Sequence, residues 1–529
     1  MSKQPVIRRA LLSVSDKTGL IPFARELEKF KVEIISTGGT LRALKQAGIA
    51  AKAVEEMTGF PEILEGRVKT LHPKIHGGLL YRRDRKSHER EALKHGILPI
   101  DLVVVNLYPF EEVTSQKSVK LETAIENIDI GGPSMLRSAA KNSESVTVIC
   151  DPGDYERVLE EMKSNHGTVS APTRQHLGQK VFERTAAYDR AITSFLKRSN
   201  HHVREPERSA LLPEKIDVTY VKTKELRYGE NPHQRAALYT ASDRPPRLKY
   251  EQLHGKELSF NNILDIEATI DVLREFAEPA ACVVKHNNPC GIAESHPVVQ
   301  ALENAIECDA MSAFGGIVGM NQPCHKQEAE TALDQLKFFE VFVAPSFDAA
   351  ALRLLKARQN LRIIATGPLG EGGPYDMRFT KGGLLLQDRD PAVISHLEDL
   401  KARLKFVTKA KLKASEIDDL IFAWKCVKVV KSNAIVLAQG RQTVGIGAGQ
   451  MSRVDSVFIA CQKAGYRAEG AFLASDAFFP MPDAIEEAHE RKIRAIIQPG
   501  GSIRDADIIA VCDLYGIAMA FTGRRHFRH

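Results

Sequence analysis

The chain has 529 residues, which is too long for one core, and at roughly 100–200 residues per domain it should form about three. Its 43% hydrophobic residues, 26% charged residues and net charge of +6 are ordinary for a globular protein and too mild for a nucleic-acid footprint. The eight scattered cysteines argue against a disulfide framework. No apolar stretch approaches the roughly 20 residues of a membrane span. We therefore expect a cytoplasmic protein that binds neither nucleic acid nor membrane.

Residues 1–200 alternate strand-like and helix-like segments, with a core expected at about 1–150. Between the first two strand-like segments, Leu20, Phe23, Ala24 and Leu27 recur at helical spacing. Such alternation predicts a doubly wound α/β domain with helices on both faces of a parallel sheet. The predicted strands are residues 10–14, 32–36, 101–110 and 146–150.

Two polar turns, SVSDKTG at 13–19 and STGGT at 36–40, each follow a predicted strand. Ligands of an open parallel sheet bind at the carboxyl ends of its strands. Glycines allow close backbone approach there, and free amides at a helix start favour a phosphate. The alternative for the second turn is an ordinary strand–helix connection capped by Thr40. The candidate phosphate-binding residues are Ser13, Ser15, Lys17, Ser36, Thr37, Gly38, Gly39 and Thr40.

A basic loop and a glycine-rich turn supply further candidates. The loop GRVKTLHPKIHGG at 66–78 is dense in cations, although such a loop can simply be solvated. Asp129 stands before Gly131-Gly132-Pro133, which suits either a carboxylate presented at a strand end or a helix cap. The candidates in this part are Arg67, Lys69, Thr70, Tyr108, Asp129 and Lys141.

The segment 201–217 is polar, charged and proline-containing, and we predict that it is a linker. Residues 218–529 again have α/β texture. Within them VVKHN at 283–287 is echoed by VVKSN at 429–433. A segment of small residues and phenylalanine follows each, AMSAFGG at 310–316 and ASDAFFP at 474–480. The echo indicates two related halves that face one site, with a break near 370–410, although short echoes also arise by chance.

The stretch VVKHNNPCG at 283–291 places Lys285 and His286 at the end of a strand-like run. Successive strand residues face opposite sides, so the two side chains share a pocket only where the strand ends. A neutral imidazole beside a cation suits removal of a proton while negative charge develops. The alternative is a lysine that reaches water and a histidine bonded to the turn. Cys290 lacks the second cysteine of a zinc deaminase, so no metal is expected.

Many short segments of the chain, in their order along the sequence, closely resemble those of the bifunctional AICAR formyltransferase/IMP cyclohydrolase family. AICAR is aminoimidazole carboxamide ribonucleotide. The resemblance extends nearly end to end. It is carried by STGGT, GRVKTLHPKIHGG, VVNLYPF, ENIDIGGPSM, RSAAKN, LRYGENPHQ, VKHNNPCG, GGLLLQD, IGAGQMSRV, SDAFFP and IQPGGSIRD. It implies a methylglyoxal-synthase-like domain followed, at 218–529, by a transformylase region of two cytidine-deaminase-like halves. It also implies a homodimer with the transferase site at the subunit interface.

The resemblance implies formyl transfer from 10-formyltetrahydrofolate, a co-substrate, to AICAR in the second part, without a tightly bound cofactor. His286 would be the base or proton shuttle, Lys285 would stabilise the oxyanion or assist the leaving nitrogen, and Asn433 would orient the formyl group. Residues expected to hold the nucleotide are Arg227, Tyr228, His233, Asn261, Phe314, Glu340, Arg525 and His529. Residues expected near the folate are Met311, Arg453, Phe478, Phe479, Pro480 and Asp483.

The second implied reaction is dehydrative ring closure of formyl-AICAR to IMP in the first part. Lys69, Tyr108, Asp129 and Lys141 match the family's catalytic positions, while Arg67 and Thr70 would join the phosphate loops. In the basic tail FTGRRHFRH, Phe527 is the expected anchor. Two alternatives remain open: a phosphate-sensing, RNA-binding regulatory protein, and a phosphate-eliminating enzyme of the methylglyoxal synthase type.

Overall fold

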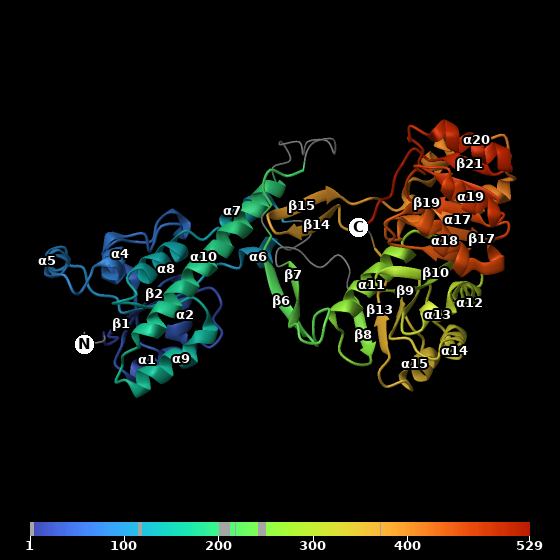
Figure 1. Cartoon of the computed structure of the whole chain (residues 1–529). Helices are drawn as coiled ribbons and strands as arrows, with labels where there is room; N and C mark the ends of the chain where they lie inside the picture. Colours follow the sequence, from blue (N-terminus) through green and yellow to red (C-terminus); the bar gives the residue numbers. More distant parts are fainter. Residues whose placement is uncertain (1–4, 115–118, 200–211, 217, 242–249, 371) are drawn as a thin grey trace. The chain divides into compact units, whose positions relative to one another are not determined.

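The computed structural model describes all residues except 1–4, 115–118, 200–211, 217, 242–249 and 371 (Figure 1). The chain divides into two compact units, Met1–Ala210 and Leu211–His529. Most of the expected linker at 201–217 lies outside the described residues. No helix in the described part of the chain is long and apolar enough to cross a bilayer.

Unit 1 is built on a five-stranded sheet in the order β3-β2-β1-β4-β5, in which every pairing is parallel. The chain leaves β1 toward β2 on one side and later returns to β4 on the other, so the strand order reverses beside β1. In such sheets the ligand crevice lies at the carboxyl ends of the strands at this point. The strands are β1 (Arg9–Val14), β2 (Glu33–Ser36), β3 (Ala51–Ala53), β4 (Leu102–Asn106) and β5 (Thr147–Ile149).

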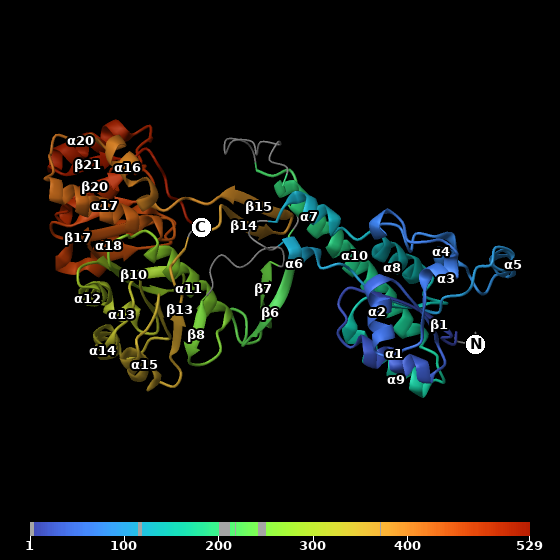
Figure 2. The same cartoon turned by 180° about the vertical axis from the view of Figure 1, so that it is seen from behind.

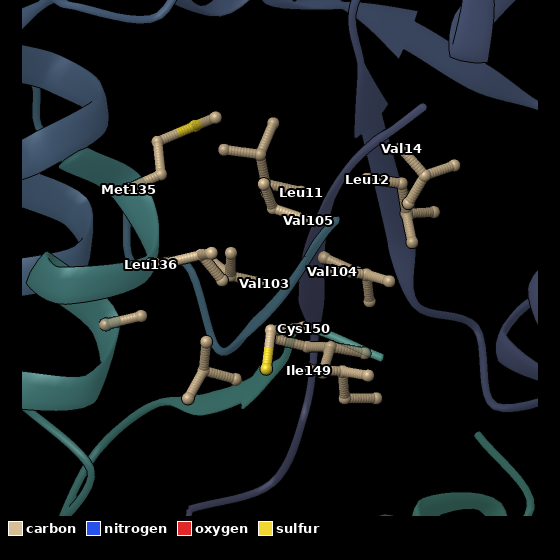
Figure 3. Packing of buried hydrophobic residues seen from close by; sticks show 14 of the residues in the cluster. Leu11, Leu12, Val14, Val103, Val104, Val105, Met135, Leu136, Ile149 and Cys150 are labelled. Atoms are coloured by element: carbon tan, nitrogen blue, oxygen red, sulfur yellow. The ribbon is translucent and has the colours of Figure 1, made fainter. Parts of the chain in front are cut away.

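Helices cover this sheet, and the long α10 packs along α8 and β5 (Figure 2). Strand β4 lies between β1 and β5 and is buried on both faces, and in Figure 3 the side chains of Met135 and Leu136 from α8 point toward it. The helices are α1 (Leu20–Lys29), α2 (Gly38–Gln46), α3 (Val54–Thr58), α4 (Pro73–Leu80), α5 (Lys86–Lys94), α6 (Phe110–Thr114), α7 (Leu121–Glu126), α8 (Gly131–Lys141), α9 (Tyr155–Ser164) and α10 (Ala171–Ser199). The predicted parallel α/β arrangement is confirmed.

Unit 2 contains a twelve-stranded mixed sheet and two separate hairpins, β6–β7 and β14–β15. Its strands are β6 (Tyr220–Leu226), β7 (Ala236–Ala241), β8 (Glu251–His254), β9 (Ala280–Lys285), β10 (Asn288–Glu294), β11 (Ile317–Met320), β12 (Val341–Ala344), β13 (Arg362–Ala365), β14 (Tyr375–Thr380), β15 (Gly383–Asp388), β16 (Lys405–Phe406), β17 (Ile435–Gln439), β18 (Gln442–Gly447), β19 (Phe472–Ser475), β20 (Ala495–Gln498) and β21 (Ala518–Phe521). Its helices are α11 (Phe260–Leu273), α12 (Val298–Cys308), α13 (Ala310–Ala313), α14 (Lys326–Gln335), α15 (Ala349–Lys356), α16 (Leu397–Arg403), α17 (Ala414–Lys428), α18 (Arg453–Ala464), α19 (Asp483–Glu490) and α20 (Asp505–Tyr515).

The large sheet is a duplication of one five-stranded pattern. In the first half β9 is antiparallel to β10 and β11, while β11, β12 and β13 are parallel. In the second half β17 is antiparallel to β18 and β19, while β19, β20 and β21 are parallel. The halves join where β10 and β18 pair, at Ala293 and Gln442. Helix α11 precedes the first pattern as α17 precedes the second.

The short sequence echo does not mark this duplication. Val283 to Lys285 end β9, whereas Val429 to Asn433 follow α17 and precede β17, so the two segments occupy different positions in the repeat. The second segment nevertheless contacts the residue that directly follows the first, because the backbone amide of Lys431 donates to Asn288 Oδ1 at 2.9 Å. The turn between β9 and β10 consists of His286 and Asn287, since β9 ends at Lys285 and β10 begins at Asn288.

Candidate active sites

The first candidate site lies where β1, β2 and β4 end in unit 1. Ser13 Oγ lies 2.9 Å from Thr37 Oγ1, which joins the two predicted phosphate turns. The Ser36 hydroxyl donates to the Leu12 carbonyl at 2.7 Å. Thr40 Oγ1 accepts from the Val14 amide and donates to the Val14 carbonyl, both at 3.0 Å. Ser36 and Thr40 therefore fix the turns, while Ser13 and Thr37 lie at their meeting point.

Three cationic groups surround the start of α2. A Cβ at Gly38 would lie 3.9 Å from Lys69 Nζ, and one at Gly39 would lie 4.0 Å from both Lys17 Nζ and Arg42 Nη2. The first amides of a helix have no partner within the helix and carry its positive dipole end. The first amides of α2 together with these three cationic groups suit a bound phosphate. Arg42 was missed from the sequence, although it stands one helical turn after Gly38 and could have been found by that spacing.

The β1 turn is held by a polar residue that the sequence analysis did not single out. Asn106, the last residue of β4, accepts from the amides of Ser15 and Asp16 at 2.6 and 3.0 Å. Its side-chain amide donates to the Asp16 carbonyl at 2.8 Å. Lys17 Nζ folds back to the Ser15 carbonyl at 3.3 Å. These bonds fix the positions of Ser15 and Lys17 relative to β4.

The second group in unit 1 gathers around the Asp129 carboxylate. Its Oδ1 accepts from the Gly132 amide at 2.8 Å, as the helix-cap interpretation predicts. Burial raises the Asp129 pKa, while the amides of Gly132 and Tyr108 and the charge of Lys69 oppose that shift. Thr70 lies beside the same turn, since its Oγ1 is 2.7 Å from the position of a Cβ on Gly131. The structure thus brings Lys69, Thr70, Tyr108 and Asp129 together.

Two predicted residues lie apart from this group. Lys141 is exposed at the last position of α8, whereas Asp129 precedes its first turn. At 1.5 Å per residue these ends are roughly 15 Å apart along the helix. Arg67 is exposed and forms an ion pair with Glu126. Proton transfer by Lys141 and phosphate binding by Arg67 stay predictions.

The second candidate site surrounds the turn between β9 and β10 in unit 2. Lys285 ends β9, and its ammonium donates to the Phe314 carbonyl at 2.8 Å. His286 and Asn287 both have left-handed backbones, with φ of 53° and 60°. Asn288, directly after the turn, holds the Lys431 amide as described above. The loop that carries Asn433 therefore lies against the Lys285–His286 turn.

The side chain of Asn433 is fixed by its own surroundings. Its Nδ2 donates to the carbonyls of Gln450 and Met451, both at 3.0 Å. Its Oδ1 accepts from Arg453 Nη2 at 2.8 Å. Arg453 is buried, and its Nη1 donates to Asp476 Oδ1 at 2.5 Å. The structure therefore makes Arg453 a support for Asn433, and contact of Arg453 with folate stays a prediction. Asp476 was not predicted, although it is the second residue of the SDAFFP segment that carries the family resemblance.

A cluster of predicted nucleotide-binding residues lies near α11. Glu340 Oε2 accepts from Asn262 Nδ2 at 2.9 Å and from Arg362 Nη1 at 3.3 Å. Burial lowers the Arg362 pKa, while Glu340 raises it and Arg227 lowers it further. Asn262 and Arg362 were not predicted from the sequence; Asn262 adjoins the predicted Asn261, whereas the distant Arg362 carries no local signal.

The other members of the predicted nucleotide set are distributed around this cluster. The Arg227 guanidinium lies 5.3 Å from the centre of the Tyr228 ring. Asn261 Nδ2 donates to the Glu230 carbonyl at 3.1 Å, which ties α11 to the turn that also carries the exposed His233. The exposed Phe314 ring lies 5.6 Å from the ring of Phe338.

The tail passes over the Asn433 loop. Ser432 and Arg528 exchange two bonds, from the Ser432 amide to the Arg528 carbonyl at 2.9 Å and from the Arg528 amide to Ser432 Oγ at 3.1 Å. The His529 backbone oxygen accepts from Lys431 Nζ and Arg378 Nη2, both at 2.8 Å. Arg525 is exposed and lies over the Phe527 ring at 4.3 Å.

The prediction that Phe527 anchors the tail is wrong. Phe527 is exposed, whereas His526 is buried, lies 5.0 Å from the Trp424 ring, and has its Nδ1 2.5 Å from Asp390 Oδ2. The imidazole is small enough to enter beside Trp424 and finds a carboxylate there. The polar histidine is therefore the buried anchor, and the exposed Phe527 ring lies beside Arg525 and His529 of the tail.

The predicted folate residues have different environments. Met311, Phe478, Pro480 and Asp483 are exposed. Phe479 is fully buried in the core of the second half, so a contact through its side chain with folate stays a prediction.

The fold and these residue groups define an α/β protein with a candidate phosphate site in one unit and a candidate lysine–histidine site in the other. A family model described as "AICARFT/IMPCHase bienzyme" matches residues 139–463, and one described as "MGS-like domain" matches residues 19–134. The bifunctional purine biosynthesis protein PurH of Bacillus subtilis (strain 168) is 51% identical over 527 residues, covering 99% of this chain and 100% of its own. PurH of Oceanobacillus iheyensis is 50% identical over 525 residues, with 99% and 100% covered. The crystal structure of ForH is 37% identical, with a TM-score of 0.35, and covers 36% of this chain and 98% of its own.

The chain belongs to the AICARFT/IMPCHase bienzyme family. It is an AICAR formyltransferase and IMP cyclohydrolase, so it performs the last two steps of purine biosynthesis, from AICAR through formyl-AICAR to IMP. Its transferase reaction uses a folate as co-substrate. The expected fold class, an MGS-like domain followed by a transformylase region, is confirmed. The alternative of an RNA-binding regulator without formyl transfer is not supported.

Proposed function

We propose that formyl transfer takes place at the β9–β10 turn and that 10-formyltetrahydrofolate is the donor. The aromatic amine of AICAR is a poor nucleophile because its lone pair is delocalised. As it attacks the formyl carbon, His286 removes the amine proton, and the carbon–nitrogen bond to the folate then breaks with proton return to the folate nitrogen. Lys285, held at the turn by the Phe314 carbonyl, stabilises the developing oxyanion. The folate leaves after each turnover, so no tightly bound cofactor is required.

In this proposal Asn433 orients the formyl group, and the cluster near α11 that contains Glu340 orients the nucleotide. Asn433 is fixed by Arg453 and two carbonyls, so its amide presents one fixed surface toward the reacting groups. Arg227, Tyr228, His233, Asn261, Phe314 and Glu340 hold the nucleotide, with Arg525 and His529 from the tail. Met311, Phe478, Phe479, Pro480, Asp483 and Arg453 form the folate side.

Ring closure takes place at the Asp129 group of unit 1. The carboxamide nitrogen attacks the new formyl carbon within one molecule; it and the former amine nitrogen each lose a proton, and the formyl oxygen leaves as water. Attack is already effectively unimolecular, so the enzyme needs to hold the conformer and move these protons. Asp129, with its raised pKa, lies beside Lys69 and Tyr108 and can exchange a proton with the reacting nitrogen. The Ser13–Lys17 and Ser36–Thr40 turns, with Arg67 and Thr70, hold the phosphate, and Lys141 is a further proton-handling residue.

The observation that carries the division of labour is the confinement of each residue group to its own compact unit. Each activity should therefore be lost separately. His286→Ala should abolish tetrahydrofolate release from AICAR and 10-formyltetrahydrofolate while leaving cyclisation of pre-formylated substrate intact. Asp129→Asn should abolish cyclisation of pre-formylated substrate while leaving formyl transfer intact. Loss of both activities in either variant, with the fold intact, contradicts the division.

A homodimer is part of the proposal. The β14–β15 hairpin exposes Phe379 at 86% and Leu385 at 63% of their surfaces, and an isolated two-stranded hairpin is marginally stable in water. Arg378 of the same hairpin bonds to His529 of the tail. A second copy covering this hairpin would therefore complete the transferase site. Phe379→Asp with Leu385→Glu should yield a monomer in sedimentation that retains cyclisation and loses transfer; a variant that stays dimeric contradicts this interface.

The proposed compartment is the cytoplasm. All eight cysteines are free and buried, which fits a reducing environment. Fractionation of cells that express the tagged chain tests this, and recovery outside the cytoplasmic fraction contradicts it.

A further inference from the structure

The β9–β10 turn is held by a carboxylate that the proposed chemistry does not use. Asp265 lies on α11, and its Oδ1 accepts from the Asn287 amide at 2.6 Å. The His286 amide also hydrogen-bonds to this carboxylate. Both bonds run from a helix to the two central residues of a hairpin turn. Asp265 therefore binds the backbone of the proposed base, through its amide.

The turn needs such support because its backbone is strained. His286 and Asn287 have φ of 53° and 60°, in the left-handed region where residues with a side chain are uncommon. Two-residue hairpins prefer Asn-Gly or Gly-Gly at these positions. Here the chain keeps a histidine in the first position and places asparagine, with no glycine, in the second. Two charge-assisted bonds to one carboxylate favour this conformation over its alternatives.

The duplication supplies an internal comparison. In the second half the turn between β17 and β18 is Gly440-Arg441, with φ of 59° and 58°. Asp419 of α17 accepts from the amides of both residues. The carboxylate–turn contact is thus repeated in the second half, but there the first turn residue is glycine and the turn lies at the other end of β10 from His286, beside Glu294.

We propose that Asp265 is a positioning residue for formyl transfer: by binding the amides of His286 and Asn287 it fixes the turn that aims the His286 imidazole at the substrate amine. Asp419 performs the same backbone function in a turn without chemistry. The inference rests on the proposed role of His286. It assigns to Asp265 an effect on kcat for formyl transfer that Asp419 does not have, whereas two carboxylates that merely stabilised the fold would have equal effects.

The first experiment compares the two carboxylates in the full-length protein. Asp265→Ala should lower kcat for formyl transfer by at least about tenfold with KM for AICAR within about twofold. Asp419→Ala should leave kcat unchanged, and both variants should cyclise pre-formylated substrate normally. Equal kinetic effects of the two variants, matched by equal losses in thermal stability, would show a structural role only and overturn the inference.

The second experiment is a rescue. Asn287→Gly introduces a residue that adopts the left-handed conformation without strain, so the turn needs the carboxylate less. Asp265→Ala combined with Asn287→Gly should therefore recover most of the lost kcat. The matched control is Asn287→Gly with the native Asp265, which should transfer formyl groups at a near-normal rate. Absence of rescue in a folded double variant, with the control active, contradicts positioning through the turn.

The third experiment separates this inference from the proposed function. If His286→Ala retains transfer, the assignment of the base fails, and the role of Asp265 fails with it. If His286→Ala is inactive and Asp265→Ala has normal kcat, only the positioning role is refuted. If Asp265 acts through His286, the double variant Asp265→Ala/His286→Ala should have the residual rate of His286→Ala alone. A further loss in the double variant would mean that Asp265 acts by another route.

Discussion

Removal of the last three residues, 527–529, should slow formyl transfer and leave cyclisation unchanged. The truncation removes both bonds between Ser432 and Arg528, at 2.9 and 3.1 Å, and the contacts of the His529 oxygen with Lys431 and Arg378. It keeps His526, so the contacts with Asp390 and Trp424 remain and the tail stays anchored.

The size of the effect follows from these bonds. Two neutral hydrogen bonds contribute about 1 kcal/mol each, and the exposed charged contacts at His529 add about 0–1 kcal/mol. The total of about 2–3 kcal/mol holds the Lys431–Asn433 loop in place. If only half of it is expressed in the transition state, kcat/KM for transfer falls by about tenfold, which corresponds to about 1.4 kcal/mol.

Steady-state kinetics of both reactions on the truncated protein, with its oligomeric state checked by sedimentation, tests this prediction. His529→Ala is the matched variant, because it removes the imidazole and keeps the backbone oxygen that Lys431 and Arg378 contact. Loss of transfer on truncation but not in His529→Ala excludes the His529 imidazole and leaves the backbone bonds of the tail, together with the Arg528 side chain that contacts Asp271 and the Val429 carbonyl, as the contributors. Unchanged transfer in the truncated protein refutes the reasoning, since the tail bonds would then contribute nothing to the site.

Three further predictions concern the two sites. Gly132→Ala should abolish cyclisation and spare transfer, because its Cβ would overlap Asp129 Oδ2 and must displace that carboxylate; normal cyclisation would contradict this. Because burial raises the Asp129 pKa, cyclisation that uses the ionised carboxylate should fall, as pH is lowered, at a higher pH than an ordinary aspartate would give, and a pH–rate profile without this limb would show that Asp129 does not act in ionised form. Lys285→Arg keeps the charge but changes the donor geometry at Phe314, so transfer should be strongly impaired, and near-normal kcat would show that charge alone suffices.

Much of the fold could be predicted from the sequence because its signals are local. The apolar runs at 10–14, 32–36 and 101–110 overlap β1, β2 and β4, and the polar turns after the first two lie at one sheet edge. The run at 146–150 likewise predicted the edge strand β5, whereas no apolar run marked the other edge strand, β3, none of whose three residues is buried. The prediction of two related halves was correct. The sequence echo that suggested it was not evidence for it, because the two echoing segments occupy non-equivalent positions in the repeat.

The sequence by itself determined the family, the residue types at each turn and the chemistry those types allow. Only the tertiary structure decided which side chains meet. Arg362 and Glu340 are 22 residues apart and Arg453 and Asp476 are 23 apart, while Asp390 and His526 are 136 apart. Periodicity describes the face of one element and carries no information about which distant element will cover it. Strand order and helix packing therefore fixed His526 as the tail anchor and placed Asp265 against the His286 turn.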